Sequence, residues 1–271
     1  MPETPVSSGY LPVGDLRMYH EVYGEGEPLV LLHGAFSAIG TSFAKLIPGL
    51  SRKRQVIGLE LQGHGRTADI DRPLTVEALA DDVVGALDQL SLERADLFGY
   101  STGGSVALHA TVRRPERVRK LVLASVGYTL GGVHPGPMEG MGEMNPEMMF
   151  GSPWHDEYME IAPRPEDFAT LFAKKAEMDS KIEDFAPETI QSIEAPVLLM
   201  IGDSDLITLE HAVEFFRLLG GGVFGDTPAG LPASRLAVLP ATSHVTMVDQ
   251  VDLIVPMVDA FLDAEAPAAS D

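Results

Sequence analysis

The stretch that decides the fold runs from Ala95 to Gly104 and reads Ala-Asp-Leu-Phe-Gly-Tyr-Ser-Thr-Gly-Gly. Its first six residues have the length and apolar character of a buried strand, and a helix-like stretch follows up to Arg113. Between the two lies a match to the pattern G-x-S-x-G, which places a serine on a sharp turn between a strand and a helix. Such a turn brings backbone segments close together, and small neighbours such as Gly99 and Gly103 allow that approach. The stretch predicts that Ser101 is an exposed nucleophile, although a strand-to-helix turn can be rich in glycine without any catalysis.

Short apolar runs and helix-like stretches alternate along the rest of the chain. This alternation predicts an α/β fold, with a mostly parallel twisted sheet flanked by helices on both faces. We expect the final helix to be bent or restarted near Pro256. The expected strands are Leu16–Tyr23, Pro28–Leu32, Gln55–Leu59, Ala95–Tyr100, Val118–Ala124, Pro196–Ile201 and Arg235–Leu239, and the expected helices are Thr41–Leu50, Thr75–Leu90, Gly103–Arg113, Thr208–Leu219 and about Val248–Asp263.

Residues 127–194 interrupt this alternation, because they carry no strand signature. Their first half is rich in Gly and Pro, and the segment contains several Met residues and aromatic side chains. We therefore expect a core made of residues 1–126 and 195–271, with residues 127–194 inserted as a helical lid. In the alternative, the Met and aromatic side chains only pack the insertion onto the sheet. The side chains expected to contact a substrate are Phe36, Met138, Met141 and Trp154.

Further landmarks occur in a fixed order along the chain. His33-Gly34-Ala35-Phe36 follows the second expected strand, Gly63-His64-Gly65-Arg66-Thr67 follows the third, and the turn at Ser101 comes next. With a distal Asp and His, the chain from about Leu16 to Leu262 resembles the α/β-hydrolase family. The sequence departs from the family's pattern at Glu60, where relatives usually have Asp, and this departure concerns the packing of the local loop.

A serine hydroxyl is nearly un-ionised at neutral pH, so it needs an imidazole to take its proton and a carboxylate to orient that imidazole. In α/β-hydrolases the chain order is Ser, then Asp or Glu, then His. His244 follows the last expected strand in a loop that can reach Ser101, whereas His211 lies in a helix-like stretch. Asp203 and Asp205 both follow the strand ending at Ile201; the resemblance favours Asp205, and we expect Asp203 to bond to its own turn.

The resemblance also implies an oxyanion hole, in which two backbone N–H groups bind the negative charge that develops during acyl transfer. One donor is the N–H of Thr102, next to the nucleophile. The other lies in the turn after Gly34, with Ala35 as the expected donor and Phe36 as the neighbouring candidate. The ring of Phe36 is alternatively a wall of the acyl pocket.

The composition excludes several classes of function. The 271 residues carry a formal net charge of −21, which repels nucleic acids and anionic membrane surfaces. The chain has no cysteine, so disulfides, thiolate metal sites and a cysteine nucleophile are excluded. No stretch reaches the ~18 apolar residues of a membrane span, and no signal-like N-terminus is present. We expect a soluble cytoplasmic protein without a metal or other cofactor.

These features together predict a carboxylic ester hydrolase that forms an acyl-enzyme on Ser101. Lactones, such as acyl-homoserine lactones, fit the same steps because ring opening only keeps the leaving alcohol tethered. The same residues leave open a cofactor-free haloperoxidase or perhydrolase and a carbon–carbon bond hydrolase. A non-catalytic ligand receptor with the same fold also remains open.

Overall fold

The computed structural model describes residues 3–136, 145–228 and 230–265. In this part of the chain eight strands form one sheet in the order β1-β2-β4-β3-β5-β6-β7-β8. The two N-terminal strands pair antiparallel and β2 joins β4 antiparallel, whereas all the other neighbours are parallel. The strands are β1 (Ser7–Val13), β2 (Leu16–Tyr23), β3 (Glu27–Leu32), β4 (Arg54–Leu59), β5 (Ala95–Tyr100), β6 (Val118–Ala124), β7 (Val197–Ser204) and β8 (Arg235–Ser243).

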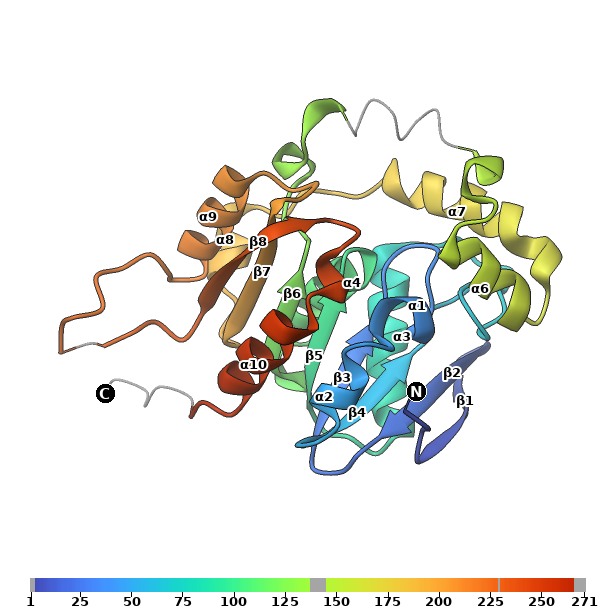
Figure 1. Cartoon of the computed structure of the whole chain (residues 1–271), viewed down its shortest axis with the longest axis horizontal. Coiled ribbons are helices and arrows are strands. Elements are labelled where there is room, and N and C mark those ends of the chain that lie inside the picture. Colours follow the sequence, from blue (N-terminus) through green and yellow to red (C-terminus); the bar gives the residue numbers. More distant parts are fainter. Residues whose placement is uncertain (1–2, 137–144, 229, 266–271) are drawn as a thin grey trace.

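Helices cover both faces of this sheet, so the predicted fold class is confirmed (Figure 1). Among the described helices, α6, α7 and α8 lie in the segment between β6 and β7. The helices are α1 (Ile39–Phe43), α2 (Ile47–Leu50), α3 (Val76–Gln89), α4 (Thr102–Arg113), α6 (Pro153–Ile161), α7 (Phe168–Asp179), α8 (Pro187–Gln191), α9 (Leu209–Leu218) and α10 (Val251–Leu262).

Two helix predictions need correction. The single helix expected over residues 41–50 is two short helices, because Pro48 has no N–H for a continuing helix and instead lies in the first turn of α2. The final helix begins at Val251 rather than Val248, since Met247–Asp249 form a separate 3₁₀ turn. It then continues through Pro256 without a break. Strand β1 was not predicted.

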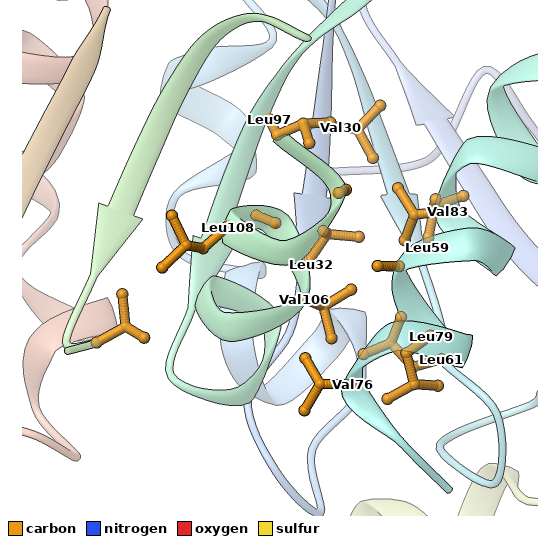
Figure 2. Close-up of a cluster of buried hydrophobic side chains, with 14 of the residues drawn as sticks. Val30, Leu32, Leu59, Leu61, Val76, Leu79, Val83, Leu97, Val106 and Leu108 are labelled. Atoms are coloured by element: carbon orange, nitrogen blue, oxygen red, sulfur yellow. The ribbon is translucent and has the colours of Figure 1, made fainter. Parts of the chain in front are cut away.

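The core has two layers because alternate residues of each strand point to opposite faces. On β3, Val30 and Leu32 face the layer under α3 and α4, whereas Leu29 and Leu31 face the layer under α1, α2 and α10. Figure 2 shows part of the first layer, where Val83 of α3 and Leu108 of α4 lie among strand side chains. Both layers are almost fully buried, so the sheet is a rigid base for the loops at its ends.

The segment between β6 and β7 lies across one end of the sheet, with α6 and α7 above the strands in Figure 1. It contacts residues that follow β3 and β4: Glu157 accepts hydrogen bonds from Thr41 of α1, and Arg164 donates to the carbonyl of Asp69 at 2.7 Å. Of its described residues, Lys175 and Met178 of α7 line a cavity together with Ser101, where β5 meets α4. In the described parts of the chain, no helix is long and apolar enough to cross a membrane.

Candidate active site

Ser101 stands on the sharp turn between β5 and α4. Its backbone has φ 53° and ψ −119°, a region that a residue with a side chain rarely adopts. The turn needs the two flanking glycines, because a Cβ on Gly99 would overlap the backbone of Gly103, and a Cβ on Gly103 would overlap the carbonyl oxygen of Leu32. This strained turn lifts the Ser101 hydroxyl clear of the sheet, as the sequence pattern predicts.

The structure brings the three predicted triad residues together. The Oγ of Ser101 lies 2.9 Å from Nε2 of His244, and Nδ1 of His244 lies 2.9 Å from Oδ1 of Asp205. An ionised carboxylate only accepts hydrogen bonds, so Nδ1 carries the proton and Nε2 is free to accept from the serine. The side chains of Ser101, His244 and Asp205, which directly follow β5, β8 and β7, are thus joined by hydrogen bonds.

Asp205 has a second partner that the sequence did not indicate. Its Oδ2 accepts a hydrogen bond from the hydroxyl of Ser125 at 2.5 Å and one from the N–H of Gly202 at 3.3 Å. Burial raises the pKa of the Asp205 carboxyl, but the hydrogen bonds and charge of His244, together with Ser125 and Gly202, outweigh it and hold the pKa below its usual value. A polar residue directly after the buried strand β6 was the available signal for Ser125.

Tyr100 is another residue whose contact was not predicted. Its hydroxyl donates a hydrogen bond to the backbone carbonyl of His244 at 2.8 Å, and burial raises the pKa of this phenol, so it keeps its proton. Because Tyr100 directly precedes Ser101, a single backbone segment positions both the serine and the histidine loop.

Asp203 accepts a hydrogen bond from the hydroxyl of Ser204 in its own turn at 3.2 Å, and it also bonds to the neighbouring strand β8. Its carboxylate accepts hydrogen bonds from the N–H groups of Ala241 at 2.8 Å and Thr242 at 3.1 Å. These two backbone hydrogen bonds lower the pKa of Asp203. Ala241 has φ 51°, so β8 bends just before His244 and leaves two amides for a side-chain acceptor. Asp203 thus fixes the approach to the His244 loop.

The two predicted oxyanion donors belong to segments that lie close to Ser101. Thr102 is the first residue of α4, and Ala35 lies in the turn after β3. The Ala35 turn is close to the serine, because a Cβ built on Gly34 would lie 3.6 Å from Cβ of Ser101.

His33 holds this turn in place. Its Nε2 accepts from the N–H of Leu61 at 3.0 Å, so Nδ1 carries the proton and donates to the carbonyl of Gly34 at 2.8 Å. Burial lowers the pKa of His33 to about 4, so the ring stays neutral.

Glu60, which stands where relatives usually have Asp, is fully buried. Its carboxylate accepts a hydrogen bond from the backbone N–H of Arg66 and pairs with Nη1 of the same residue at 2.8 Å. Burial raises the pKa of Glu60 to about 7, against the opposing effect of Arg66. The longer side chain fits because Gly65 leaves the space in which a Cβ would overlap its carboxyl group.

His211, the other histidine that follows a plausible acid, has a different environment. It lies in α9, where its Nε2 accepts from the N–H of Tyr128 at 3.2 Å and its ring stacks on that of Tyr128. This contact ties α9 to the start of the segment that crosses the sheet.

A cavity of about 150 Å³ opens beside Ser101 and His244. Phe36 and Trp154 are not among the described residues that line it; Phe36 instead stacks on Phe172 of α7, with ring centroids 5.0 Å apart. The predicted contacts at Met138 and Met141 fall outside the described residues. The walls are largely apolar and include Val76, Leu108, Val126, Tyr128, Met178 and Ile207.

Known proteins share this fold. The family model for the alpha/beta hydrolase fold matches residues 27–179. The chain is 30% identical to 2-hydroxy-6-oxo-2,4-heptadienoate hydrolase of Pseudomonas putida, over 91% of this chain and 92% of that protein. It is 39% identical to 2-hydroxymuconate semialdehyde hydrolase of a Pseudomonas species, but there the match spans only 37% of this chain and 36% of the relative.

Among solved structures, an enol-lactonase from Burkholderia xenovorans superposes with a TM-score of 0.69 at 21% identity, covering 94% of this chain and all of that one. The chain therefore belongs to the α/β-hydrolase fold family and is a hydrolase of that family, as its sequence predicts.

Proposed function

We propose that the protein hydrolyses small carboxylic esters and lactones through an acyl-enzyme on Ser101. The observation that carries this proposal is the continuous chain of two 2.9 Å hydrogen bonds from Ser101 through His244 to Asp205. A serine within reach of a base that is itself oriented by a buried carboxylate is the arrangement that activates a hydroxyl for acyl transfer.

In the proposed reaction, Ser101 attacks the ester carbonyl while His244 takes its proton. The N–H groups of Thr102 and Ala35 then bind the oxygen that becomes negative. His244 returns the proton to the leaving alcohol, and a water molecule activated by the same histidine releases the acid. Asp205 keeps its charge throughout and stabilises the transient imidazolium.

The cavity favours a small substrate. A cavity of about 150 Å³ is large enough for a ligand the size of benzene. Its apolar walls suit a short acyl chain or a lactone ring, and the enol-lactonase with the same fold is named for acting on such a ring. We further propose that residues 127–194 act as a lid, because helix α7 contributes Met178 to the cavity wall.

A second candidate is the hydrolysis of a carbon–carbon bond, which the name of the full-length Pseudomonas putida relative describes. Serine, histidine and aspartate can serve that reaction as well. The substrate in that name is a dienoate anion, however, and the cavity here is bordered by the carboxylates of Asp179, Glu183 and Asp184. Lys175 neutralises Asp179, but Glu183 and Asp184 leave an excess of negative charge among the lining residues, which disfavours an anionic substrate, so we place ester hydrolysis first.

The test is turnover of p-nitrophenyl esters from acetate to octanoate, of simple lactones and of a dienoate, with Ser101→Ala as control. We expect kcat/KM to be highest for short acyl groups, and Ser101→Ala to lower kcat by roughly 10⁴-fold or more while the melting temperature is kept. Turnover of the dienoate alone would favour the second candidate. Ester turnover unchanged in Ser101→Ala would refute the proposed nucleophile.

A further inference from the structure

Lys175 of α7 lines the same cavity as Ser101 and His244. Only 8% of its side chain is exposed, which is unusual because a buried ammonium group loses its hydration. The residue takes no part in the reaction proposed above. We therefore consider which group the ammonium of Lys175 binds.

The contacts of Lys175 leave part of its hydrogen-bonding capacity unused. Its Nζ lies 2.6 Å from both Oδ1 and Oδ2 of Asp179, one turn further along α7. An ammonium group has three N–H donors, and two carboxylate oxygens engage at most two of them. Among the described residues, no other acceptor lies within hydrogen-bond distance of this Nζ. At least one N–H is thus left for an acceptor that is not part of the described chain, and a buried donor without a partner is costly.

The charges around Lys175 decide which kind of acceptor fits. Asp179 already neutralises the ammonium group, and the exposed Glu183 and Asp184 add two carboxylates to the border of the cavity. An anionic acceptor would bring a further negative charge to this region, whereas a neutral oxygen would complete the hydrogen bonding without repulsion.

We propose that Lys175 is a specificity-determining residue that binds a second, neutral carbonyl oxygen of the substrate, away from the bond that is cleaved. This inference rests on the proposed function, because it takes Ser101 as the point at which the acyl group is attached. The substrate class is then a short oxoacyl ester or a lactone with an additional carbonyl group. The acceptor and the scissile carbonyl both lie in the cavity that Ser101 and Lys175 line.

The competing account is that Lys175 and Asp179 only stabilise α7 as a pair four residues apart, with a water molecule on the remaining N–H. The two accounts differ in substrate preference. A helix-stabilising pair affects all substrates alike, whereas a carbonyl-binding lysine affects only those that carry the second carbonyl group.

The experiment compares three p-nitrophenyl esters of similar length: pentanoate, 4-oxopentanoate and hemisuccinate. Their kcat/KM values are measured for the wild-type protein, Lys175→Met and the control Lys181→Met, an exposed lysine of the same segment. We expect the wild type to prefer the 4-oxopentanoate over the pentanoate, and Lys175→Met to reduce that ratio by roughly ten- to hundredfold. Because a ratio of two substrates does not depend on the fraction of folded enzyme, a loss of stability in Lys175→Met leaves the test intact.

Asp179→Asn supplies a second arm, since it removes the neutralising charge. We expect this variant to gain activity toward the hemisuccinate relative to the 4-oxopentanoate. Equal wild-type rates for 4-oxopentanoate and pentanoate, a wild-type preference for the hemisuccinate, or an unchanged ratio in Lys175→Met would each overturn the inference.

The two proposals fail in different ways. If no ester is hydrolysed, the proposed function fails, and the dissociation constants of pentanoate and 4-oxopentanoate esters are measured on Ser101→Ala by calorimetry. Tighter binding of the oxo ester that is lost on adding Lys175→Met supports the lysine as a carbonyl-binding residue without any turnover. Equal dissociation constants refute it.

Discussion

At the scale of single residues, Ser125 and Tyr100 show how a candidate site depends on more than the residues that react. Ser125 supports Asp205 by a hydrogen bond, and Tyr100 supports His244 through its backbone carbonyl. Both are positioning residues, because neither contacts the Ser101 hydroxyl. Precise placement of the base matters since a small displacement of a reacting group can cost a large factor in rate.

Ser125→Ala is the direct test of this support. Without the hydroxyl, Oδ2 of Asp205 keeps only the 3.3 Å bond from Gly202, so the pKa of Asp205 should rise. We expect kcat to fall about tenfold with KM nearly unchanged, and the acid limb of the pH–rate profile to move to higher pH. The control is Ser234→Ala, a buried serine whose Oγ accepts from Val197 at the start of β7, away from the site. If Ser125→Ala and Ser234→Ala have the same effect on kcat, and the pH–rate profile does not move, then Ser125 has only a structural role.

Asp203 and Asp205, at the carboxyl end of β7, are expected to differ in how strongly their replacement lowers kcat. Asp205→Asn removes the acceptor that fixes the His244 tautomer, so kcat should fall by on the order of 10⁴-fold. Asp203→Asn keeps one acceptor oxygen for the amides of β8 and should lower kcat far less. Steady-state kinetics of the two variants measures the difference, and a larger loss in Asp203→Asn would reassign the acid.

At the scale of elements, the loop after β4 contains a group that titrates near neutrality. The pKa of Glu60 is raised to about 7 by burial, whereas in the unfolded chain it lies near 4.5. Between these values the folded state binds more protons than the unfolded state, so this residue makes the free energy of unfolding fall as pH rises from about 4.5 to 7. The effect is complete above pH 7, where both states are ionised.

Glu60→Gln should therefore remove one part of the pH dependence of stability. We expect the free energy of unfolding of the wild type, relative to that of the variant, to fall by on the order of 3 kcal/mol between pH 4.5 and pH 8. Urea unfolding at several pH values measures both curves. Glu21→Gln is the control, since this half-buried carboxylate lies beside the same Arg66. Parallel curves for wild type and Glu60→Gln would contradict the raised pKa.

The elements also show what the sequence could and could not predict. Strands β2, β5 and β6 have the predicted bounds: β5 and β6 are buried parallel strands with a high apolar content, whereas β2 is antiparallel and its side chains alternate loosely. The N-terminal strand β1 was missed, since it lies at the edge of the sheet and exposes several of its side chains. The order Ser, Asp, His came from the resemblance to the α/β-hydrolase family, and the loop position of His244 distinguished it from His211. The position of Ser125 directly after β6 was a signal for that residue, but its contact with Asp205 and that of Tyr100 with His244 could not be predicted, because they join segments that only the folded sheet brings together.

At the scale of the whole molecule, the formal charge of −21 is the dominant electrostatic property. Forty acidic residues against nineteen basic ones mean that at least 21 carboxylates have no basic side chain to neutralise them. Their mutual repulsion is relieved when the chain expands, so it favours the unfolded state at neutral pH. Dissolved salt screens charges that are separated by more than about 8–10 Å and should reduce this repulsion.

We therefore expect the melting temperature at pH 7.5 to rise as NaCl increases from about 0.01 to about 0.5 M, where the Debye length shortens severalfold. Each kcal/mol of relieved repulsion corresponds to about 2–4 °C for a domain of this size. The same salt series at pH 4.6, near the isoelectric point, is the control, because the net charge there is close to zero. Salt bridges such as Arg119–Asp96 are weakened by salt, which acts in the opposite direction. A melting temperature that falls with salt at pH 7.5 would mean that these local pairs outweigh the repulsion of the whole surface.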